Sequence, residues 1–393
     1  MTGIKTVAVF APMFPPAFLG GGPIRTLDAL VGEAPEDWQV RVLTSDRDLG
    51  GGSRLPVLSN DWVVTGSRSV YYMTTDRVTS VLRGFLALRR AKPDLLYFNS
   101  FFDLLFSIVP QLLCDIFFNR RPIRLLAPRG EFSAGALAMR SRKKRLFIGV
   151  FRALRLQHKL VWHASTELEA GDIRRIWGVD AVVLVREDET RLPVHAAAPL
   201  AKETSDLSAI FLGRIVPNKG LLILLEALQS VTAPIQLDIY GSEEDARYAE
   251  SCHRVAANAA PNVSVNFMGS VPPDDVRGHF NSYDLFLMPT AGENFGHVIA
   301  EALSASCPVM CTDTTPWTEL LEAGAGEVVR SSTPDGWREA IDSYAALTLS
   351  DRLDRRLAAG RLYEEWRSAA KGPHVFSMIR ELNPLSIPRG RDL

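Results

Sequence analysis

The chain has 393 residues, of which 47% are hydrophobic and 23% are charged. This length suffices for roughly two or three domains, and the composition excludes a disordered or low-complexity chain. The formal net charge of -1 argues against a dedicated nucleic-acid-binding protein, so we expect no nucleic-acid partner.

Charge is distributed unevenly along the chain. Residues 1–200 carry 27 Lys and Arg against 19 Asp and Glu, whereas residues 201–393 carry 17 against 26. The two halves therefore have net charges of +8 and -9. Opposite signs indicate two domains with different partners.

The four cysteines, Cys114, Cys252, Cys307 and Cys311, are too few and too scattered for a disulfide framework or a zinc site. We expect reduced thiols in a cytoplasmic protein that shows no signal-peptide pattern. The longest apolar stretch, residues 101–118, is interrupted by two acids, a proline and a glutamine, so we do not expect it to span a membrane.

In the first half, short apolar runs alternate with helical patterns, which predicts a parallel sheet covered by helices. A helix is expected over residues 23–32. The expected strands cover residues 5–11, 38–44, 94–98, 123–127, 159–164 and 181–185.

Residues 192–206 combine two prolines with a run of alanines, which is typical of a linker. A second alternating series follows, with expected strands at 209–213, 235–240, 263–268, 285–288, 308–311 and 326–329. Helices are expected over 351–367 and 375–382, and the last ten residues look frayed. The fold class is therefore α/β, with domains over 1–190 and 207–370, a linker over 191–206, and a tail over 371–393 that can cross back to the first domain.

The first candidate site is a loop that contains Gly20, Gly21 and Gly22 and precedes the predicted helix. Consecutive glycines at a helix N-terminus allow close backbone approach to a phosphate. A flexible surface turn is equally compatible with the pattern. The spacing is not the dinucleotide Gly-x-Gly-x-x-Gly fingerprint, which makes a dehydrogenase the least favoured enzyme class.

The second candidate site is the sequence Gly-Arg-Ile-Val-Pro-Asn-Lys-Gly at residues 213–220, directly after a predicted strand. Ligands of parallel α/β sheets bind beyond the carboxyl ends of the strands. Arg214 and Lys219 are two cations near one helix N-terminus, which suits a diphosphate. An ordinary solvated loop is the alternative.

The third candidate site starts at Glu293 and ends at Glu301, eight residues later. The amides of Asn294, Phe295 and Gly296 are expected to be unsatisfied donors at the start of a helix, available to a phosphate or to sugar hydroxyls. Glu301 can accept hydrogen bonds from a vicinal diol such as a ribose. The alternative is that Glu293 caps the helix and Glu301 lies on its surface.

Together, Gly-Arg-x4-Lys-Gly and Glu-x-Phe-Gly-x4-Glu-Ala-Leu resemble the C-terminal signature of the retaining GT-B glycosyltransferases of family four, the glycosyl transferases group 1. Local matches at residues 238–242, 267–271, 307–309 and 313–317 support the resemblance. It implies a GT-B fold, in which two Rossmann-like domains face each other across a cleft. It also implies a sugar-nucleotide donor in the C-terminal domain and an acceptor in the N-terminal domain.

The resemblance further implies roles for single residues. Arg214 and Lys219 would bind the donor diphosphate and stabilise the leaving group, and Glu293 would contact the transferred sugar. The other donor-binding positions implied are Gly21, Gly22, Tyr240, Gly241, Val271, Asn294, Phe295, Gly296 and Glu301. No Asp-x-Asp motif is present in the second half, where the donor is expected to bind, so no metal or other cofactor is expected.

The sequence departs from the family in three places. The usual Gly-x-Gly after Tyr240 reads Gly241-Ser-Glu, and the usual end of the linker is replaced over residues 183–188. Where many members have a histidine, this chain has Pro-Arg-Gly-Glu at 128–131, as in a subgroup that resembles bacterial surface-polysaccharide transferases. Arg129 and Glu131 are therefore candidates for acceptor binding.

A basic segment in the first half also suggests a partner. Between residues 104 and 160 there are twelve Lys and Arg and two acids, and Ser-Arg-Lys-Lys-Arg at 141–145 leads into an apolar helical pattern. Such a helix is typical of peripheral contact with an anionic membrane, here the inner face of the cell membrane, although a solvated helix packed on its sheet is equally compatible.

The predicted function is a retaining, metal-independent hexosyltransferase that moves a sugar from a nucleotide-diphosphate sugar to a glycan or lipid-linked saccharide in cell-surface polysaccharide or glycolipid biosynthesis. The alternatives are a catalytically silent GT-B subunit that binds a nucleotide or a partner, and a GT-B sugar-nucleotide epimerase or hydrolase. An epimerase or hydrolase would require further acidic or histidine side chains. His163 and His297 are weakly placed for that role, and His163 is better interpreted as structural.

Overall fold

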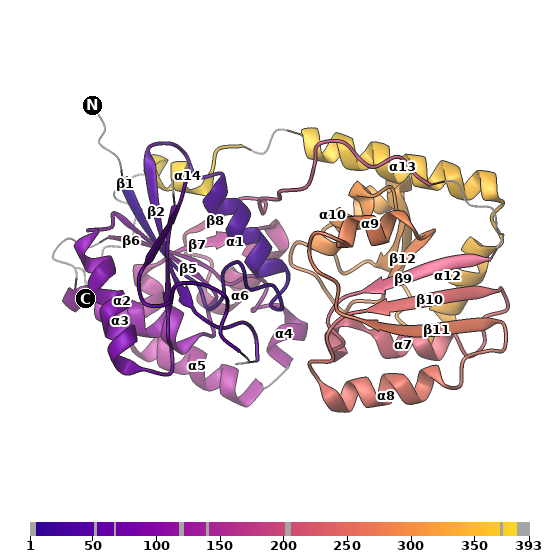
Figure 1. The fold of residues 1–393 in the computed structure, drawn as a ribbon, viewed down its shortest axis with the longest axis horizontal. Coiled ribbons are helices and arrows are strands. Elements are labelled where there is room, and N and C mark those ends of the chain that lie inside the picture. The colour runs from indigo at the N-terminus through magenta and orange to yellow at the C-terminus, as the bar shows by residue number, and fades with distance from the viewer. Residues whose placement is uncertain are drawn as a thin grey trace. The chain divides into compact units, whose positions relative to one another are not determined.

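The computed structural model describes residues 5–50, 53–66, 68–117, 122–138, 141–200, 206–369 and 372–382. The chain divides into two compact units, one comprising Met1–Thr190 with Lys371–Leu393 and the other Arg191–Ala370. Each unit is a twisted, mainly parallel sheet with helices packed against it (Figure 1). The expected frayed end lies outside the described residues.

The first unit contains an eight-stranded sheet in the order β3-β4-β2-β1-β5-β6-β7-β8. The pairing is parallel throughout, except that β3 and β4 form an antiparallel hairpin at one edge. The six predicted strands are confirmed to within two residues, whereas the hairpin was not predicted. The strands are β1 Lys5–Phe10, β2 Trp38–Ser45, β3 Trp62–Thr65, β4 Arg68–Met73, β5 Leu95–Asn99, β6 Ile123–Ala127, β7 Val161–Ala164 and β8 Val183–Val185.

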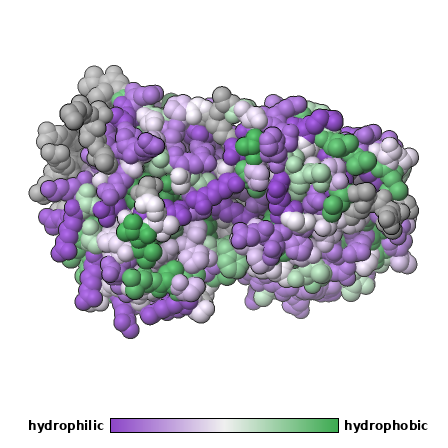
Figure 2. Space-filling model, turned by 45° about the horizontal axis from the view of Figure 1, so that its top comes forward, coloured by the Kyte–Doolittle hydropathy of each residue, from purple (hydrophilic) through white to green (hydrophobic). Residues whose placement is uncertain are grey.

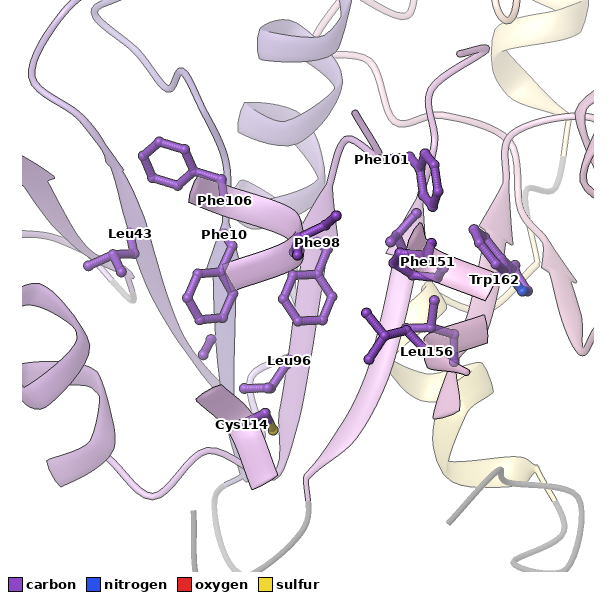
Figure 3. Packing of buried hydrophobic residues seen from close by; sticks show 14 of the residues in the cluster. Phe10, Leu43, Leu96, Phe98, Phe101, Phe106, Cys114, Phe151, Leu156 and Trp162 are labelled. Carbon is purple, nitrogen blue, oxygen red and sulfur yellow. The ribbon is translucent and has the colours of Figure 1, made fainter. Parts of the chain in front are cut away.

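Helices cover both faces of this sheet. On one face, the core joins β1, β5 and β7 to η1, α3 and α5 through aromatic side chains such as Phe98, Phe106, Phe151 and Trp162 (Figure 3). On the other face, α1 and α14 close a second core. The helical segments are α1 Gly22–Gly32, α2 Val78–Arg90, η1 Leu104–Ile108, α3 Val109–Phe117, α4 Ala134–Ala138, α5 Ser141–Ala153, η2 Leu156–Lys159, α6 Glu167–Trp177 and α14 Val375–Glu381.

The second unit contains a six-stranded, wholly parallel sheet in the order β11-β10-β9-β12-β13-β14, and all six of its predicted strands are confirmed. The strands are β9 Leu207–Leu212, β10 Ile235–Tyr240, β11 Val263–Gly269, β12 Leu285–Met288, β13 Val309–Thr312 and β14 Gly326–Val329. The helical segments are η3 Pro217–Lys219, α7 Leu221–Ala227, α8 Ala246–Ala256, α9 Val276–Asn281, α10 His297–Ser304, α11 Thr318–Leu320, η4 Leu321–Ala325, α12 Pro334–Ala345 and α13 Leu349–Ser368.

The described part of the expected linker, residues 191–200, contains no helix or strand and packs within the second unit. The Ala196 amide donates to the Glu364 carboxylate over 2.9 Å, and the Ala197 amide donates to the Ser304 carbonyl over 2.8 Å. These bonds attach the segment to α13 and α10.

Two surface features bear on function. Within the described residues, no helix combines the length and the apolar character that crossing a membrane requires. On the face shown in Figure 2, polar residues cover most of the surface and apolar residues gather in small groups.

In each unit, the loops that follow the parallel strands share one edge of the sheet, where ligands of this architecture bind.

Candidate functional site

In the second unit, the loops after β9 and β12 bring a cation and a carboxylate together. The Lys219 Nζ atom contacts the Glu293 Oε1 atom, and the Thr290 hydroxyl donates to the same oxygen over 3.1 Å. The two charged side chains are 17% and 13% exposed, so solvent reaches both. Two residues that the sequence placed in separate motifs are thus adjacent.

Glycine makes this approach possible. Gly220 has a φ of +70°, and a Cβ atom at this position would lie 1.8 Å from the Pro289 carbonyl oxygen. Any other residue would push the two loops apart. The Ala291 amide donates to the Asn218 carbonyl over 2.9 Å and joins the loops a second time.

The end of β13 fixes the loop that carries Glu293. The Thr312 and Thr314 hydroxyls donate to the Thr290 carbonyl over 2.6 and 3.1 Å. The Glu293 amide donates to the Thr314 carbonyl over 3.3 Å. Threonine hydroxyls and backbone groups of the loops after β9, β12 and β13 therefore hold the carboxylate in place.

The helix after Glu293 begins too far along the chain for Glu293 to be its N-cap. Helix α10 starts at His297, and its N-cap is Gly296, which has a φ of +82° and supplies no side-chain cap. The alternative interpretation of Glu293 as a cap is therefore wrong. The Phe295 side chain is buried, and its carbonyl accepts a hydrogen bond from the Trp317 indole.

Glu301 lies on α10 and is only 7% exposed, so its interpretation as a surface residue is also wrong. Burial of a carboxylate costs free energy unless hydrogen bonds or a nearby cation compensate for the lost hydration. Ribose binding by Glu301, and donor contacts by the amides of residues 294–296, stay predictions.

The remaining predicted donor residues surround the β9 loop. The Arg214 guanidinium donates to the Glu244 carboxylate over 2.8 Å. Gly241 has a φ of +155°, and a Cβ atom there would lie 1.8 Å from the Gly213 carbonyl oxygen, so the loops after β9 and β10 also touch. The Tyr240 ring is buried, and Val271 packs against the same apolar cluster.

In the first unit, the glycine loop leads directly into α1. Gly21 is the N-cap, with a φ of +68°, and a Cβ atom there would meet nothing within 4 Å. Gly22 is the first residue of the helix. The Asp48 carboxylate accepts the Phe18 and Leu19 amides over 2.9 and 3.2 Å and holds the preceding turn. The phosphate contact stays a prediction.

Arg129 lies in a buried network at the carboxyl ends of β5, β6 and β8. Its guanidinium contacts the Asp188 carboxylate and donates to Asn99 Oδ1 over 2.8 Å and to the Tyr97 hydroxyl over 2.6 Å. The Thr26 hydroxyl, on α1, donates to the other oxygen of Asp188 over 3.1 Å. The Arg129 and Asp188 side chains are only 5% and 3% exposed.

The Glu131 carboxylate also forms hydrogen bonds within the first unit. Its carboxylate accepts the Ser100 hydroxyl over 2.7 Å and the Phe101 and Phe102 amides over 2.6 and 3.1 Å. Burial raises the pKa of Glu131, and these hydrogen bonds act in the opposite direction. Glu131 thus shapes the loop after β5.

The partners of Arg129 were not predicted from the sequence. One of them, Tyr97, extends the network to His163. Tyr97 and His163 share a hydrogen bond of 2.9 Å between the hydroxyl and Nδ1, and the His163 Nε2 atom lies 3.2 Å from the Arg186 carbonyl. Burial, and then the nearby Arg129 charge, lower the pKa of His163 to about 3, so it is neutral at pH 7. In the sequence, the only feature that could have indicated this network is that its polar residues stand in or just after predicted strands.

Solved structures identify the fold class. Sucrose-phosphate synthase from Thermosynechococcus elongatus superimposes with a TM-score of 0.71 at 15% identity, over 96% of this chain and 97% of that chain. Anabaena HepE in complex with UDP and glucose gives a TM-score of 0.69 at 15% identity, over 96% and 98%. The chain therefore has the GT-B fold, as predicted.

Sequence comparisons show which proteins parts of the chain resemble. Residues 206–346, which carry the Lys219 and Glu293 loops, match the glycosyl transferases group 1. Phosphatidyl-myo-inositol mannosyltransferase of Mycobacterium tuberculosis is 29% identical over 234 residues, which span 56% of this chain and 60% of that protein. The putative teichuronic acid biosynthesis glycosyltransferase TuaC of Bacillus subtilis is 27% identical over 137 residues, 35% of this chain and 32% of that protein. The chain is a GT-B protein similar to the glycosyltransferases of family four.

Proposed function

We propose that the protein is a glycosyltransferase that moves a sugar from a nucleotide-diphosphate sugar to a hydroxyl of a glycan or lipid-linked saccharide. The observation that carries the proposal is the Lys219–Glu293 contact, held by Thr290 where the loops after β9 and β12 meet. A cation and a hydroxyl-binding carboxylate at one strand edge match the two ends of a glycosyl diphosphate.

The proposed chemistry separates the two charges. Lys219, with Arg214, neutralises the diphosphate as it leaves, which stabilises the charge that develops in the transition state. Glu293 is released from Lys219 and accepts hydrogen bonds from hydroxyls of the transferred sugar. We propose that the configuration at the anomeric carbon is retained, that no enzyme nucleophile takes part, and that the two cations replace a metal ion.

A panel of sugar nucleotides tests the proposal, read out by thermal shift and by release of nucleoside diphosphate. We expect one donor to raise the melting temperature and to be hydrolysed slowly without an acceptor. NMR of the anomeric proton in the product checks retention, and activity in excess EDTA checks metal independence. A panel in which every donor leaves both the melting temperature and the nucleotide intact would rule out the proposal.

We further propose that the acceptor is met at a membrane surface, as for a lipid-linked saccharide. On α5, Leu146 and Val150 are 70% and 41% exposed and lie four residues apart on one stripe, which Leu154 extends. Arg142 and Lys143 are exposed on the same helix. An apolar stripe flanked by cations suits the surface of an anionic bilayer. Relatives named phosphatidyl-myo-inositol mannosyltransferase agree with such an acceptor.

A further inference from the structure

A depression of about 480 Å³ lies in the first unit, at the β3 edge of the sheet. It is bounded by β2, by the β3–β4 hairpin and by the C-terminal half of α2. Its volume falls in the range of small-molecule sites. Its lining includes Arg41, Asp61, Trp62, Tyr71, Arg83 and Arg90.

The depression carries an excess of positive charge. Arg41, Arg83 and Arg90 line it together with one acid, Asp61, whose Oδ1 atom accepts the Trp62 amide over 2.7 Å. Across the described ranges of the chain, none of the three guanidinium groups forms an ion pair with a carboxylate. The arginines are therefore available to an anion from outside.

Arg41 is held in position at the wall. Its guanidinium lies 5.2 Å from the centre of the Trp62 ring, and that ring packs edge-on against Tyr71 at 5.4 Å between centres. The Arg41 Nε atom is buried, and it has no hydrogen-bond partner among the residues that the structure describes. Because buried donors in folded proteins are nearly always paired, this unpaired donor indicates that the Arg41 guanidinium has hydrogen-bonding capacity left for an acceptor.

We propose that this depression binds a saccharide that carries a phosphate or carboxylate group. Guanidinium groups form paired, charge-assisted hydrogen bonds with either group. A bare inorganic anion would fill only part of the volume, whereas a sugar ring can occupy the remainder beside Trp62, Tyr71 and the polar edge. The site is separate from the Arg129 loop, because β1 and β5 lie between β2, which bounds the depression, and β6.

Calorimetric titration of the full chain tests the inference without measuring catalysis. The background is Arg214→Ala/Lys219→Ala, so that the other phosphate-binding loop does not contribute. The probes are glucose 6-phosphate and trigalacturonate, with glucose and inorganic phosphate for comparison. We expect at least one acidic saccharide to bind about tenfold more tightly than either comparison compound. Whichever of glucose 6-phosphate and trigalacturonate binds more tightly indicates whether the site prefers a phosphate or a carboxylate group.

Matched variants locate the binding. Arg41→Gln and Arg83→Gln should each weaken the acidic saccharide by about tenfold, whereas Lys92→Gln, an exposed cation beyond the end of α2, should change it by less than about twofold. Arg83 is exposed, so its substitution leaves the fold intact even if Arg41→Gln does not. The inference fails if no acidic saccharide binds better than glucose, if inorganic phosphate binds as well as glucose 6-phosphate, or if Lys92→Gln weakens binding as much as Arg83→Gln.

Discussion

The two units hold their charged residues at strand ends in opposite ways. In the second unit, Lys219 and Glu293 are partly exposed, and threonine hydroxyls and backbone groups of three loops support them. In the first unit, Arg129 and Asp188 are almost completely buried, and side chains from neighbouring elements occupy their hydrogen-bonding groups.

This difference separates a pair that can change partners from one that cannot. A partly exposed ion pair contributes little to stability, so a ligand can replace one partner at low cost. A buried pair has already lost its hydration, and removal of one partner leaves an uncompensated charge. We therefore expect substitutions in the second unit to affect turnover and substitutions in the first to affect stability.

The largest effect is expected for Lys219→Ala. Loss of the cation that stabilises the leaving diphosphate should lower kcat by about a thousandfold, while the free energy of unfolding falls by only about 1–3 kcal/mol, because Glu293 keeps its bond to Thr290. Donor turnover and chemical denaturation measure the two quantities. Arg355→Ala is the control, because Arg355 forms a half-exposed pair with Glu327 at 3.4 Å in the same unit and should leave turnover unchanged. Full turnover in Lys219→Ala would contradict the proposed site.

The next largest effect is expected for Arg129→Met. It should appear in the free energy of unfolding and not in turnover. The Asp188 charge would stay buried but would lose the Arg129 guanidinium, so the first unit should lose about 3–5 kcal/mol of stability. Hydrogen exchange of the β6 amides measures this loss locally. Adding Asp188→Asn should recover part of it. A variant that keeps its stability but loses turnover would instead place Arg129 at the acceptor and would break the comparison.

The sequence predicted what short-range signals encode. The parallel strands follow from apolar runs of strand length between helical patterns, and all six in the second unit were found. Lys219 and Glu293 were proposed because each follows a predicted strand and because their two motifs together resemble a family signature, whereas spacing alone left other interpretations open. The hairpin β3–β4 was missed, although the aromatic and β-branched residues 62–65 and 70–72 favour strands.

What the sequence did not predict depends on long-range pairing. Lys219 and Glu293 are 74 residues apart in the chain, and their contact follows from the neighbouring positions of β9 and β12 in the sheet. The environment of Arg129 required the order of β5 to β8 and the path of the segment that carries Asp188. No local pattern marks that aspartate as the partner of an arginine 59 residues away.

The buried network also predicts a pH dependence for the first unit. The pKa of His163 is about 3 in the folded protein, against an ordinary value of 6.5. The unfolded chain takes up a proton below pH 6.5 and the folded chain does not, so stability is present above pH 6.5 and is lost as the pH falls towards 3. The slope is about 1.4 kcal/mol per pH unit. His163→Gln should remove it, measured as the difference between denaturation curves of the two proteins from pH 7 to 5. The pKa of His374 is also lowered by burial, but its contribution is the same in both proteins and cancels.

The smallest effect concerns the outer surfaces of the units, where one helix of each provides a matched pair. On α5, the exposed stripe that starts at Leu146 lies on a helix with five Lys and Arg and no acid. On α13, Leu349, Leu353 and Leu357 form a stripe with the same spacing and are 40–41% exposed, but five arginines there are offset by four acids.

If apolar exposure alone drove membrane contact, both stripes would bind vesicles equally. If contact needs cations beside the apolar stripe, Leu146→Ser should reduce binding to phosphatidylglycerol vesicles by about fivefold, and Leu353→Ser should leave it unchanged. Co-sedimentation with anionic and with neutral vesicles measures the difference. The effect should shrink in high salt, because screening weakens the attraction of Arg142, Lys143 and Arg145 to the surface. Equal losses in the two variants, or equal binding to neutral vesicles, would show that the basic charge of the first unit has no part in membrane contact.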